Sequence, residues 1–316
     1  MKTKRVGVLM GGPSSEREIS IKSGKAVCKA LEAKQIDYVP VELMPGPNTN
    51  GYKESVAAKL ALLKIDVAFL ALHGEFGEDG TVQELLEGMS MPYTGSSSGA
   101  SKVAMNKITA KEVLKSNNVP IAGHEILARG SFNKDLDIKA YFKLLGPSLV
   151  IKPSNGGSSI GLNIADNEKD LRAAIEDAFR YDDKLIIEEY ISGREITVGV
   201  IEDRALPIVE IVPKRKFFDF TAKYEKGLTE YIVPAEIDEQ TYKMCQEVGL
   251  RTHKVLSARS FSRVDIILNK KIGPVVLELN MIPGLTETSL LPKAARAAGI
   301  EFEELCLKIL NTALLE

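Results

Sequence analysis

The chain has 316 residues, of which 44% are hydrophobic and 27% charged, and its formal net charge is −2. That length is too great for one ordinary hydrophobic core and predicts two or three domains. The nearly balanced charge argues against general binding to nucleic acid or to an anionic membrane, and no apolar run approaches the length of a membrane span. The three cysteines are far apart and favour neither a disulfide nor a zinc site, so we expect a protein of the reducing cytoplasm.

The first hundred residues alternate short apolar runs with loops and helical patterns. Residues 5–10 read as a buried strand, which is followed by the loop GGPSS and by a helix from about Ser15. Ser15 and Glu18 have the spacing of a capping box at the start of that helix. Residues 65–72 read as a second buried strand, and the loop HGEFGEDG and the helical stretch TVQELLEGM follow it. This repeat predicts a parallel α/β domain with ligand-binding loops at the ends of its strands.

The pattern changes after a small, polar stretch at 92–99, which marks a candidate domain boundary. A helix that carries Lys107 comes next, and residues 147–200 read as β-rich structure with glycine turns. Residues 212–233 are charged and aromatic without a clear period, which predicts a mobile lid. Two strands and a helix from about Phe302 complete the chain.

Two acidic residues face each other in the hairpin predicted at 261–280, which would turn between residues 269 and 274. Side chains two apart on a strand share a face, so a symmetric hairpin places Asp265 across from Glu278 and Arg263 across from Asn280. Facing carboxylates repel by roughly 3 kcal/mol at an effective dielectric of about 20, and a cation between them would favour the pairing. Such hard oxygen ligands suit Mg²⁺, which shares phosphate oxygens with nucleotides. A second interpretation stays open, in which Arg263 neutralises both acids on a solvated strand face.

A loop rich in glycine and serine follows a predicted strand that ends in Lys152, within the sequence LVIKPSNGGSSIG at 149–161. Glycines let backbone amides approach phosphate oxygens, and the hydroxyls and the lysine add donors. The loop lacks the GxxxxGK[ST] pattern of a Walker A motif, and a plain hairpin turn would have the same composition. Lys107 could reach a second phosphate. Glu188 and Glu195, which bracket a predicted hairpin EEYISGRE, could bind ribose hydroxyls and line an adenine slot, although an exposed acidic edge fits them equally well.

Together these segments resemble the D-alanine–D-alanine ligases, which are ATP-grasp enzymes of peptidoglycan precursor synthesis. The similarity spans nearly the whole chain, and the shared order and spacing of its segments is specific although each segment alone is weak. The matching segments are GGPSSEREIS at 11–20, ALHGEFGEDG at 71–80, PYTGS at 92–96, KPSNGGSSIG at 152–161, GREITVGV at 193–200, AKY at 222–224, RVD at 263–265 and LELNMIPGLTETSLLP at 277–292.

The resemblance implies an α/β fold of the three-domain ATP-grasp architecture. A parallel α/β substrate domain would occupy residues 1–97, a small central domain residues 98–187, and a C-terminal domain with the metal and substrate sites and the lid residues 188–316. ATP would lie between the last two domains. The residues implied to bind it are Lys107, Lys152, Ser159, Glu188, Glu189, Ile191 and Glu195, and the implied ligands of two Mg²⁺ ions, for which Mn²⁺ could substitute, are Asp265, Glu278 and Asn280.

The resemblance also implies that ATP converts the carboxylate of one D-alanine into an acyl phosphate, which the amine of a second D-alanine attacks. Glu16 would bind the first ammonium group, while Arg263 and the amide of Gly284 would stabilise the tetrahedral oxyanion. Ser158 and Tyr224 would link the glycine-rich loop to Glu16 when the lid closes. The residues implied to bind the substrates are His73, Lys223, Ser289 and Leu290.

Two positions depart from the family pattern: Asn106 stands where Asp is usual, and Met281 stands where Thr or Ser is usual. Neither change removes a group that the chemistry needs. Tyr224 favours the dipeptide product, because related ligases that make a depsipeptide have phenylalanine there. The expected partners are D-alanine, ATP and a second copy of the chain in a homodimer, without nucleic acid or membrane.

Three other functions stay open from the sequence. The second substrate could be D-lactate or D-serine. The chain could instead be a non-catalytic nucleotide-binding regulator, which would bind ATP without releasing phosphate when D-alanine is added. The basic and aromatic residues at 214–218 could form a nucleic-acid patch, although the overall charge argues against it.

Overall fold

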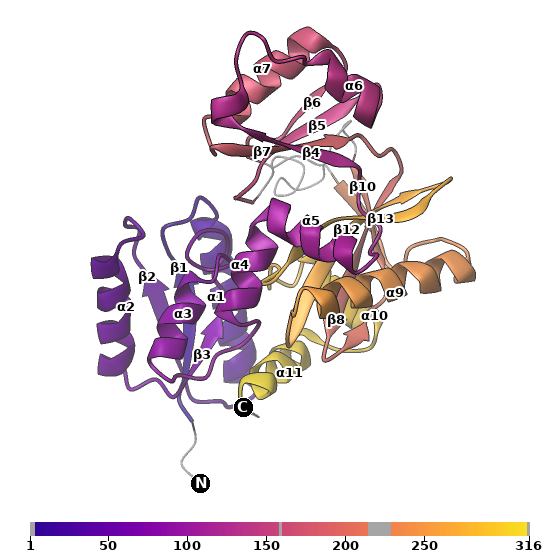
Figure 1. The fold of residues 1–316 in the computed structure, drawn as a ribbon. Helices are drawn as coiled ribbons and strands as arrows, with labels where there is room; N and C mark the ends of the chain where they lie inside the picture. Colours follow the sequence, from indigo (N-terminus) through magenta and orange to yellow (C-terminus); the bar gives the residue numbers. More distant parts are fainter. Residues whose placement is uncertain (1–3, 158–159, 214–228, 315–316) are drawn as a thin grey trace.

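A computed structural model describes residues 4–157, 160–213 and 229–314 (Figure 1). These residues form three sheets, and the four-stranded sheet β4-β7-β5-β6 stands apart from the other two in Figure 1. The predicted site residues Ser158, Ser159, Lys223 and Tyr224, and the basic patch at 214–218, lie outside the described residues. None of the described helices is long and apolar enough to cross a membrane.

The N-terminal sheet is parallel, with the strand order β2-β1-β3. β1 (Val6–Gly11) and β3 (Val67–Leu70) are buried over their whole length, as their continuous apolar runs predict for strands covered on both faces. β2 (Tyr38–Leu43) forms one edge. The predicted parallel α/β arrangement is therefore confirmed. Its helices are α1 (Arg17–Ala33), α2 (Asn50–Leu62) and α3 (Thr81–Gly88).

The predicted capping box at Ser15 is wrong. α1 begins after Glu16, whose side chain makes no capping hydrogen bond. Ser14 Oγ instead accepts a hydrogen bond from the Glu16 amide at 3.0 Å, a local serine turn that competes with the box. The Glu16 carboxylate is consequently not used in a cap, and it lies at the end of β1 where a parallel sheet places its ligand loops.

The four-stranded sheet is antiparallel and has a hydrophobic core of its own, which runs from Leu127 to Ile187. Its strands are β4 (His124–Ala128), β5 (Leu149–Pro153), β6 (Asn163–Ala165) and β7 (Lys184–Glu189). The β-rich pattern predicted here missed helix α7 (Glu168–Ala178), which begins after the Asn167 cap and buries one face. A 3₁₀ turn (Arg129–Ser131) and α6 (Lys139–Leu145) complete this body.

Two helices lead into this body, α4 (Ser98–Met105) and α5 (Lys107–Ser116). The chain breaks between them at Asn106, whose side-chain oxygen accepts a hydrogen bond from the Thr109 amide at 3.0 Å. Asn106 therefore caps α5, as an aspartate would, and its amide also donates to Asn155 at 3.0 Å. Ala110 and Leu114 on α5 pack into the large core that the N-terminal and C-terminal sheets share.

The C-terminal sheet has the order β11-β10-β8-β12-β13, with β9 paired to β8. Residues 214–228 of the predicted lid lie outside the described residues, and β10 and β11 flank them as an antiparallel pair. C-terminal helix α11 lies against α1 (Figure 1). The elements are β8 (Arg194–Ile201), β9 (Arg204–Ala205), β10 (Val209–Pro213), β11 (Thr229–Ile232), α9 (Glu239–Val255), β12 (Phe261–Asn269), β13 (Gly273–Asn280), α10 (Leu290–Ala297) and α11 (Phe302–Leu314).

The hairpin predicted for EEYISGRE is wrong. β7 pairs with β4 and β5, whereas β8 pairs with β9, β10 and β12, so the segment between them crosses from one sheet to another. Glu188 and Glu195 consequently lie on two different sheets that face each other. We propose that the chain divides into units at 1–97, 98–187 and 188–316, with α5 bridging the central unit and the large core.

Candidate active site

Asp265 on β12 lies directly across from Glu278 on β13, and Arg263 lies across from Asn280, as the sequence predicts. The turn is shorter than predicted, because Asn269 pairs with Gly273. A β-bulge at Leu277 compensates, since Asp265 pairs with Glu278 while the next residue of β12 pairs with Val276. The bulge also changes the faces: Leu277 and Glu278 line the same cavity, although strict alternation would place them on opposite faces.

Side chains from three of the described residues hold the carboxylate of Asp265, a residue that is 7% exposed. Arg263 donates to both of its oxygens at 2.8 Å. Thr197 donates at 2.8 Å from the neighbouring strand β8, and Asn280 donates at 3.0 Å. Arg263 thus neutralises Asp265, but within the described part of the chain Glu278 has no ion-pair partner. Of the second interpretation, the neutralisation by Arg263 holds for Asp265 alone, and the solvated strand face is wrong for this residue because Asp265 is buried.

The donor set of this hairpin fits a hard divalent cation. Asp265, Glu278 and Asn280 supply two carboxylates and an amide oxygen at one place, and Glu278 faces the cavity without an ion-pair contact in the described ranges. No cluster of three or more His, Cys, Asp or Glu side chains in those ranges is placed to hold a metal ion. Water and ligand oxygens would have to complete the coordination, as Mg²⁺ prefers.

Two cavities meet at this hairpin. The first, the inter-sheet cleft, has a volume of about 460 Å³ and lies between the four-stranded sheet and the C-terminal sheet. The second, the loop cavity, has about 600 Å³ and is lined by the loops after β1 and β3 and by the segment after β13. Four residues line both cavities: Lys107, Gly156, Gly157 and Glu278.

Every predicted site residue that the structure describes lines one of these cavities. The inter-sheet cleft contains Lys107, Lys152, Glu188, Glu189, Ile191, Glu195, Asp265 and Glu278. The loop cavity contains Glu16, His73, Lys107, Arg263, Glu278, Asn280, Gly284, Ser289 and Leu290. Met281, the departure from the family pattern, also lines the loop cavity, and its side chain is buried in the large core.

The inter-sheet cleft has a charged floor. Lys152 on β5 donates to Glu188 Oε2 at 2.9 Å, and Lys111 Nζ lies 3.1 Å from Glu188 Oε1. Burial alone would raise the pKa of Glu188, but Lys152 and Lys111 lower it to about 2. Burial would lower the pKa of Lys152, and Glu188 outweighs it, so this pKa is raised. Both side chains are therefore charged at neutral pH.

The loop after β3 forms hydrogen bonds with the backbone of Ile282 in the loop cavity. The Ile282 carbonyl lies 3.0 Å from His73 Nδ1, and its amide donates to Glu78 Oε1 at 3.3 Å. Because a carbonyl only accepts, Nδ1 carries the proton of His73, and Nε2 accepts from Ser23 Oγ at 3.0 Å. Ser23 Oγ in turn accepts from the Leu285 amide at 3.3 Å. These contacts bind the chain on both sides of Gly284 to α1 and to the loop after β3.

Glu78 is a site residue that the sequence interpretation did not single out, although it lies in the motif HGEFGEDG. Its Oε2 also accepts a hydrogen bond from the Gly74 amide at 2.8 Å. Burial, and then the nearby Glu16 carboxylate, raise the pKa of Glu78 above its usual range. Burial lowers the pKa of His73, so the imidazole is neutral at pH 7. The sequence signal that could have identified Glu78 is its position as an acidic residue in the loop that follows a buried strand.

Ser289 and Gly284 are in close contact at the far wall of the loop cavity. A side-chain carbon at Gly284 would come within 2.8 Å of Ser289 Oγ, so glycine is needed for the approach. Ser289 Oγ accepts a hydrogen bond from the Thr286 amide at 3.1 Å. It precedes α10 without capping it, which leaves the amides of the first turn for another acceptor.

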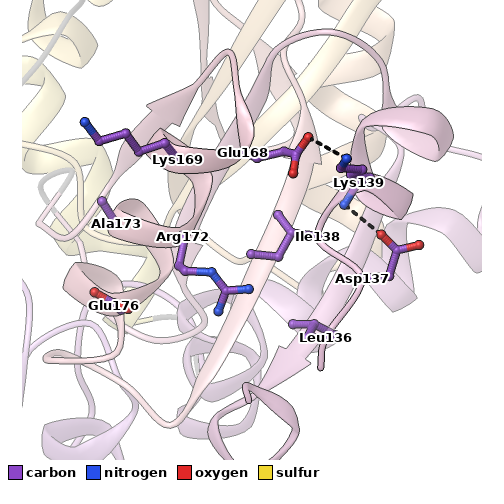
Figure 2. A pocket seen from close by; sticks show the side chains of 9 residues that line it. All are labelled: Leu136, Asp137, Ile138, Lys139, Glu168, Lys169, Arg172, Ala173 and Glu176. Atoms are coloured by element: carbon purple, nitrogen blue, oxygen red, sulfur yellow. Dashed lines mark hydrogen bonds and ion pairs between the residues drawn. The ribbon is translucent and has the colours of Figure 1, made fainter. Parts of the chain in front are cut away.

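A third hollow, of about 470 Å³, lies on the outside of the central body between α6 and α7 (Figure 2). Acidic and basic side chains alternate around it, and Lys139 is paired with Glu168 at 3.5 Å. The predicted site residues do not reach it.

A parallel α/β sheet joined to two antiparallel sheets that enclose a charged cleft is the architecture of an ATP-grasp ligase. The models of two families match most of the chain, the D-ala D-ala ligase N-terminus at residues 5–54 and 44–96 and the D-ala D-ala ligase C-terminus at residues 113–311. The chain belongs to the D-alanine–D-alanine ligase family.

Relatives and solved structures agree with this membership. A D-alanine–D-alanine ligase of Geotalea uraniireducens is 43% identical over 100% of this chain and 97% of its own length. The D-alanine–D-alanine ligase of Bacillus anthracis complexed with ATP has a TM-score of 0.83 and 33% identity, covering 99% of this chain and 98% of that chain. The VanG D-Ala:D-Ser ligase of Enterococcus faecalis has the same TM-score of 0.83 at 28% identity, covering 99% of this chain and 100% of that chain.

Proposed function

We propose that this chain joins two D-alanine molecules into D-alanyl-D-alanine and converts ATP into ADP and phosphate, in the cytoplasm and for peptidoglycan precursors. The observation that carries the proposal is the shared wall of the two cavities, formed by Lys107, Gly156, Gly157 and Glu278. A nucleotide in the inter-sheet cleft would direct its terminal phosphate toward this wall, and a substrate in the loop cavity would approach the same phosphate from the other side.

The inter-sheet cleft supplies the groups that a nucleotide needs. Lys107 and Lys152 would bind the phosphates, residues 188–191 would contact the adenine, and Glu195 the ribose. Asp265, Glu278 and Asn280 would hold Mg²⁺, or Mn²⁺ in its place. When bound, the metal would neutralise phosphate charge and hold the transferring group in line.

The loop cavity supplies the groups for ligation. Glu16 would bind the ammonium of the first D-alanine, whose carboxylate attacks the terminal phosphorus and displaces ADP. The amine of the second D-alanine then attacks the carbonyl of the acyl phosphate, and phosphate leaves. Arg263 and the Gly284 amide would stabilise the oxyanion, a contribution of about 3–4 kcal/mol for one donor in other enzymes. His73, Ser289 and Leu290 would surround the second substrate.

The roles of four residues rest on the sequence alone, because Ser158, Ser159, Lys223 and Tyr224 lie outside the described residues. We propose that Ser159 contacts a phosphate, that Lys223 binds the second carboxylate, and that Ser158 and Tyr224 connect the glycine-rich loop to Glu16. A homodimer is proposed on family resemblance alone.

The direct test is phosphate release from ATP with and without D-alanine, together with mass detection of the dipeptide. We expect release only when D-alanine is present, in the amount of the dipeptide formed. ATP binding without D-alanine-dependent release would favour a nucleotide-binding regulator instead. Chelation of divalent cations should stop both readouts, and continued synthesis would contradict the metal assignment.

A different acceptor is the second candidate, because the VanG D-Ala:D-Ser ligase shares this fold at 28% identity. Competition between D-alanine, D-serine and D-lactate as second substrates separates the two. We expect the D-alanine dipeptide to dominate at neutral pH, and a majority of mixed product would identify the alternative acceptor.

A further inference from the structure

Lys111 lies beneath the inter-sheet cleft and has no role in the function proposed above. It is on α5, one helical turn after Lys107, and only 3% of its side chain is exposed. Like charges four residues apart destabilise a helix, and a buried ammonium group is costly unless it is paired. The same helix nevertheless carries both lysines on the face toward the cleft. This arrangement indicates that the positive charge of the two lysines serves a ligand in the cleft.

Glu188 is shared by two lysines. Lys152 donates a hydrogen bond to Oε2 at 2.9 Å, and Lys111 Nζ lies 3.1 Å from Oε1. The Lys111 contact lies at ion-pair distance, and Lys111 acts on Glu188 chiefly through its charge. Among the groups in direct contact, two ammonium groups face one carboxylate, which leaves one positive charge uncompensated by contact at the floor of the cleft, and Glu278 acts on both lysines without an ion-pair contact.

The surplus charge is directed into the cleft. Lys152 and Glu188 line the cavity, whereas Lys111 lies behind them. Glu278 is the further acid that acts on both lysines, and it is a proposed ligand of the metal. Burial lowers the pKa of Lys111 while Glu188 opposes that shift. Without Lys111, Lys152 and Glu188 would form a closed pair of opposite charges.

We propose that Lys111 is a positioning residue for the anionic part of the ligand in the inter-sheet cleft. The positive charge of Lys111 compensates the negative charge of Glu188 at Oε1. The positive charge of Lys152 is then available to a phosphate group. The inference rests on the proposed function, because it takes a nucleotide as the ligand.

The test compares the dissociation constants of ADP and adenosine by calorimetry for the wild-type protein and for Lys111→Met, which keeps the length of the buried stem. We expect ADP binding to weaken about tenfold, from loss of one nearby positive charge, and adenosine binding to change less than about twofold. Lys115→Met is the matched control, since Lys115 is exposed on the same helix and should leave both constants unchanged.

A second variant separates charge from packing. Adding Glu188→Gln to Lys111→Met removes one charge of each sign and restores the surplus on Lys152. The ratio of the ADP and adenosine constants should then return to within about threefold of wild type. Equal weakening of both ligands by Lys111→Met, an unchanged ADP constant, or no recovery of the ratio would each overturn the inference. A wild-type protein that binds neither ligand would contradict the proposed function itself.

Discussion

Arg263 is tied to Asp265 by two hydrogen bonds of 2.8 Å and also lines the loop cavity, so one guanidinium serves both cavities. Its planar fork matches a carboxylate in a way that a lysine does not. Arg263 therefore couples the proposed metal site to the place where the oxyanion forms. We therefore expect the removal of Arg263 to affect the rate of ligation more than the affinity for the nucleotide.

We predict that Arg263→Ala lowers kcat for dipeptide synthesis by about 10²–10³, because an oxyanion donor is lost. The dissociation constant of ADP should change by less than about threefold, since Arg263 does not line the inter-sheet cleft. The amount of dipeptide formed in quenched reactions gives kcat, and calorimetry gives the dissociation constant of ADP. Wild-type turnover in this variant would remove the oxyanion assignment.

Gly74 is needed for a close approach at the end of β3. Its φ is +66°, and a side-chain carbon would lie 2.3 Å from Ser14 Oγ and 2.9 Å from Glu16 Oε2. We predict that Gly74→Ala lowers the free energy of unfolding by about 1–3 kcal/mol and raises KM for D-alanine by displacing Glu16. Gly51→Ala is the control, because Gly51 lies in α2 with nothing within 4 Å, and the change should keep KM and should not lower the free energy of unfolding. Equal denaturation curves for the two variants would contradict this account.

At the scale of elements, α9 rests on β12 through a buried histidine. His253 is 2% exposed, and its Nδ1 lies 2.7 Å from Ser262 Oγ. Burial lowers the pKa of His253 to about 4. Between pH 6.5 and 4 the unfolded chain therefore binds more protons here than the folded protein, and stability rises with pH.

We accordingly predict that the His253 contribution is complete above about pH 6.5 and is lost as the pH falls through about 4. The expected loss is about 3 kcal/mol of unfolding free energy for this group. Urea denaturation at a series of pH values measures it, with His253→Gln as the comparison. The prediction fails if the difference between wild type and variant does not depend on pH in this interval.

The sequence predicts the elements with strong periodicity and misses those that depend on distant partners. Alternating side chains identify β12 and β13 and place Asp265 opposite Glu278. No local pattern reveals the bulge at Leu277. The predicted turn was one residue too long, and the bulge offsets that error, so that the predicted pairing of the two acids is still correct. EEYISGRE has the composition of a hairpin, and pairing with other sheets overrides it. Lys111 was missed because its function depends on Glu188, which is 77 residues away in the chain.

At the scale of the whole molecule, two hydrophobic cores divide the structure unequally. The N-terminal and C-terminal sheets share one core, whereas the four-stranded sheet has its own. The loop cavity is lined mostly by the larger unit, with Gly156 and Gly157 of the four-stranded unit at the shared wall, and His73 and Glu78 join its walls at Ile282. The inter-sheet cleft instead lies between the two units.

We predict that Glu78→Gln loosens the loop cavity without affecting the cleft. A glutamine nitrogen cannot accept from the second of the two backbone amides, which leaves one buried donor unpaired at a cost of about 1–3 kcal/mol. KM for D-alanine should rise while the ADP constant stays unchanged. Glu75→Gln, an exposed position of the same loop, is the control and should match wild type in both measurements. A change in ADP affinity alone would contradict this division of roles.

The transfer of an oxygen atom tests most directly whether the substrate carboxylate meets the terminal phosphate at the shared wall. D-alanine labelled with ¹⁸O in its carboxylate is incubated with ATP and the protein, and the released phosphate is analysed by mass spectrometry. Attack by the carboxylate predicts one ¹⁸O in the phosphate for each dipeptide formed. Dipeptide accompanied by unlabelled phosphate would contradict the acyl phosphate and the meeting of the two cavities as its site.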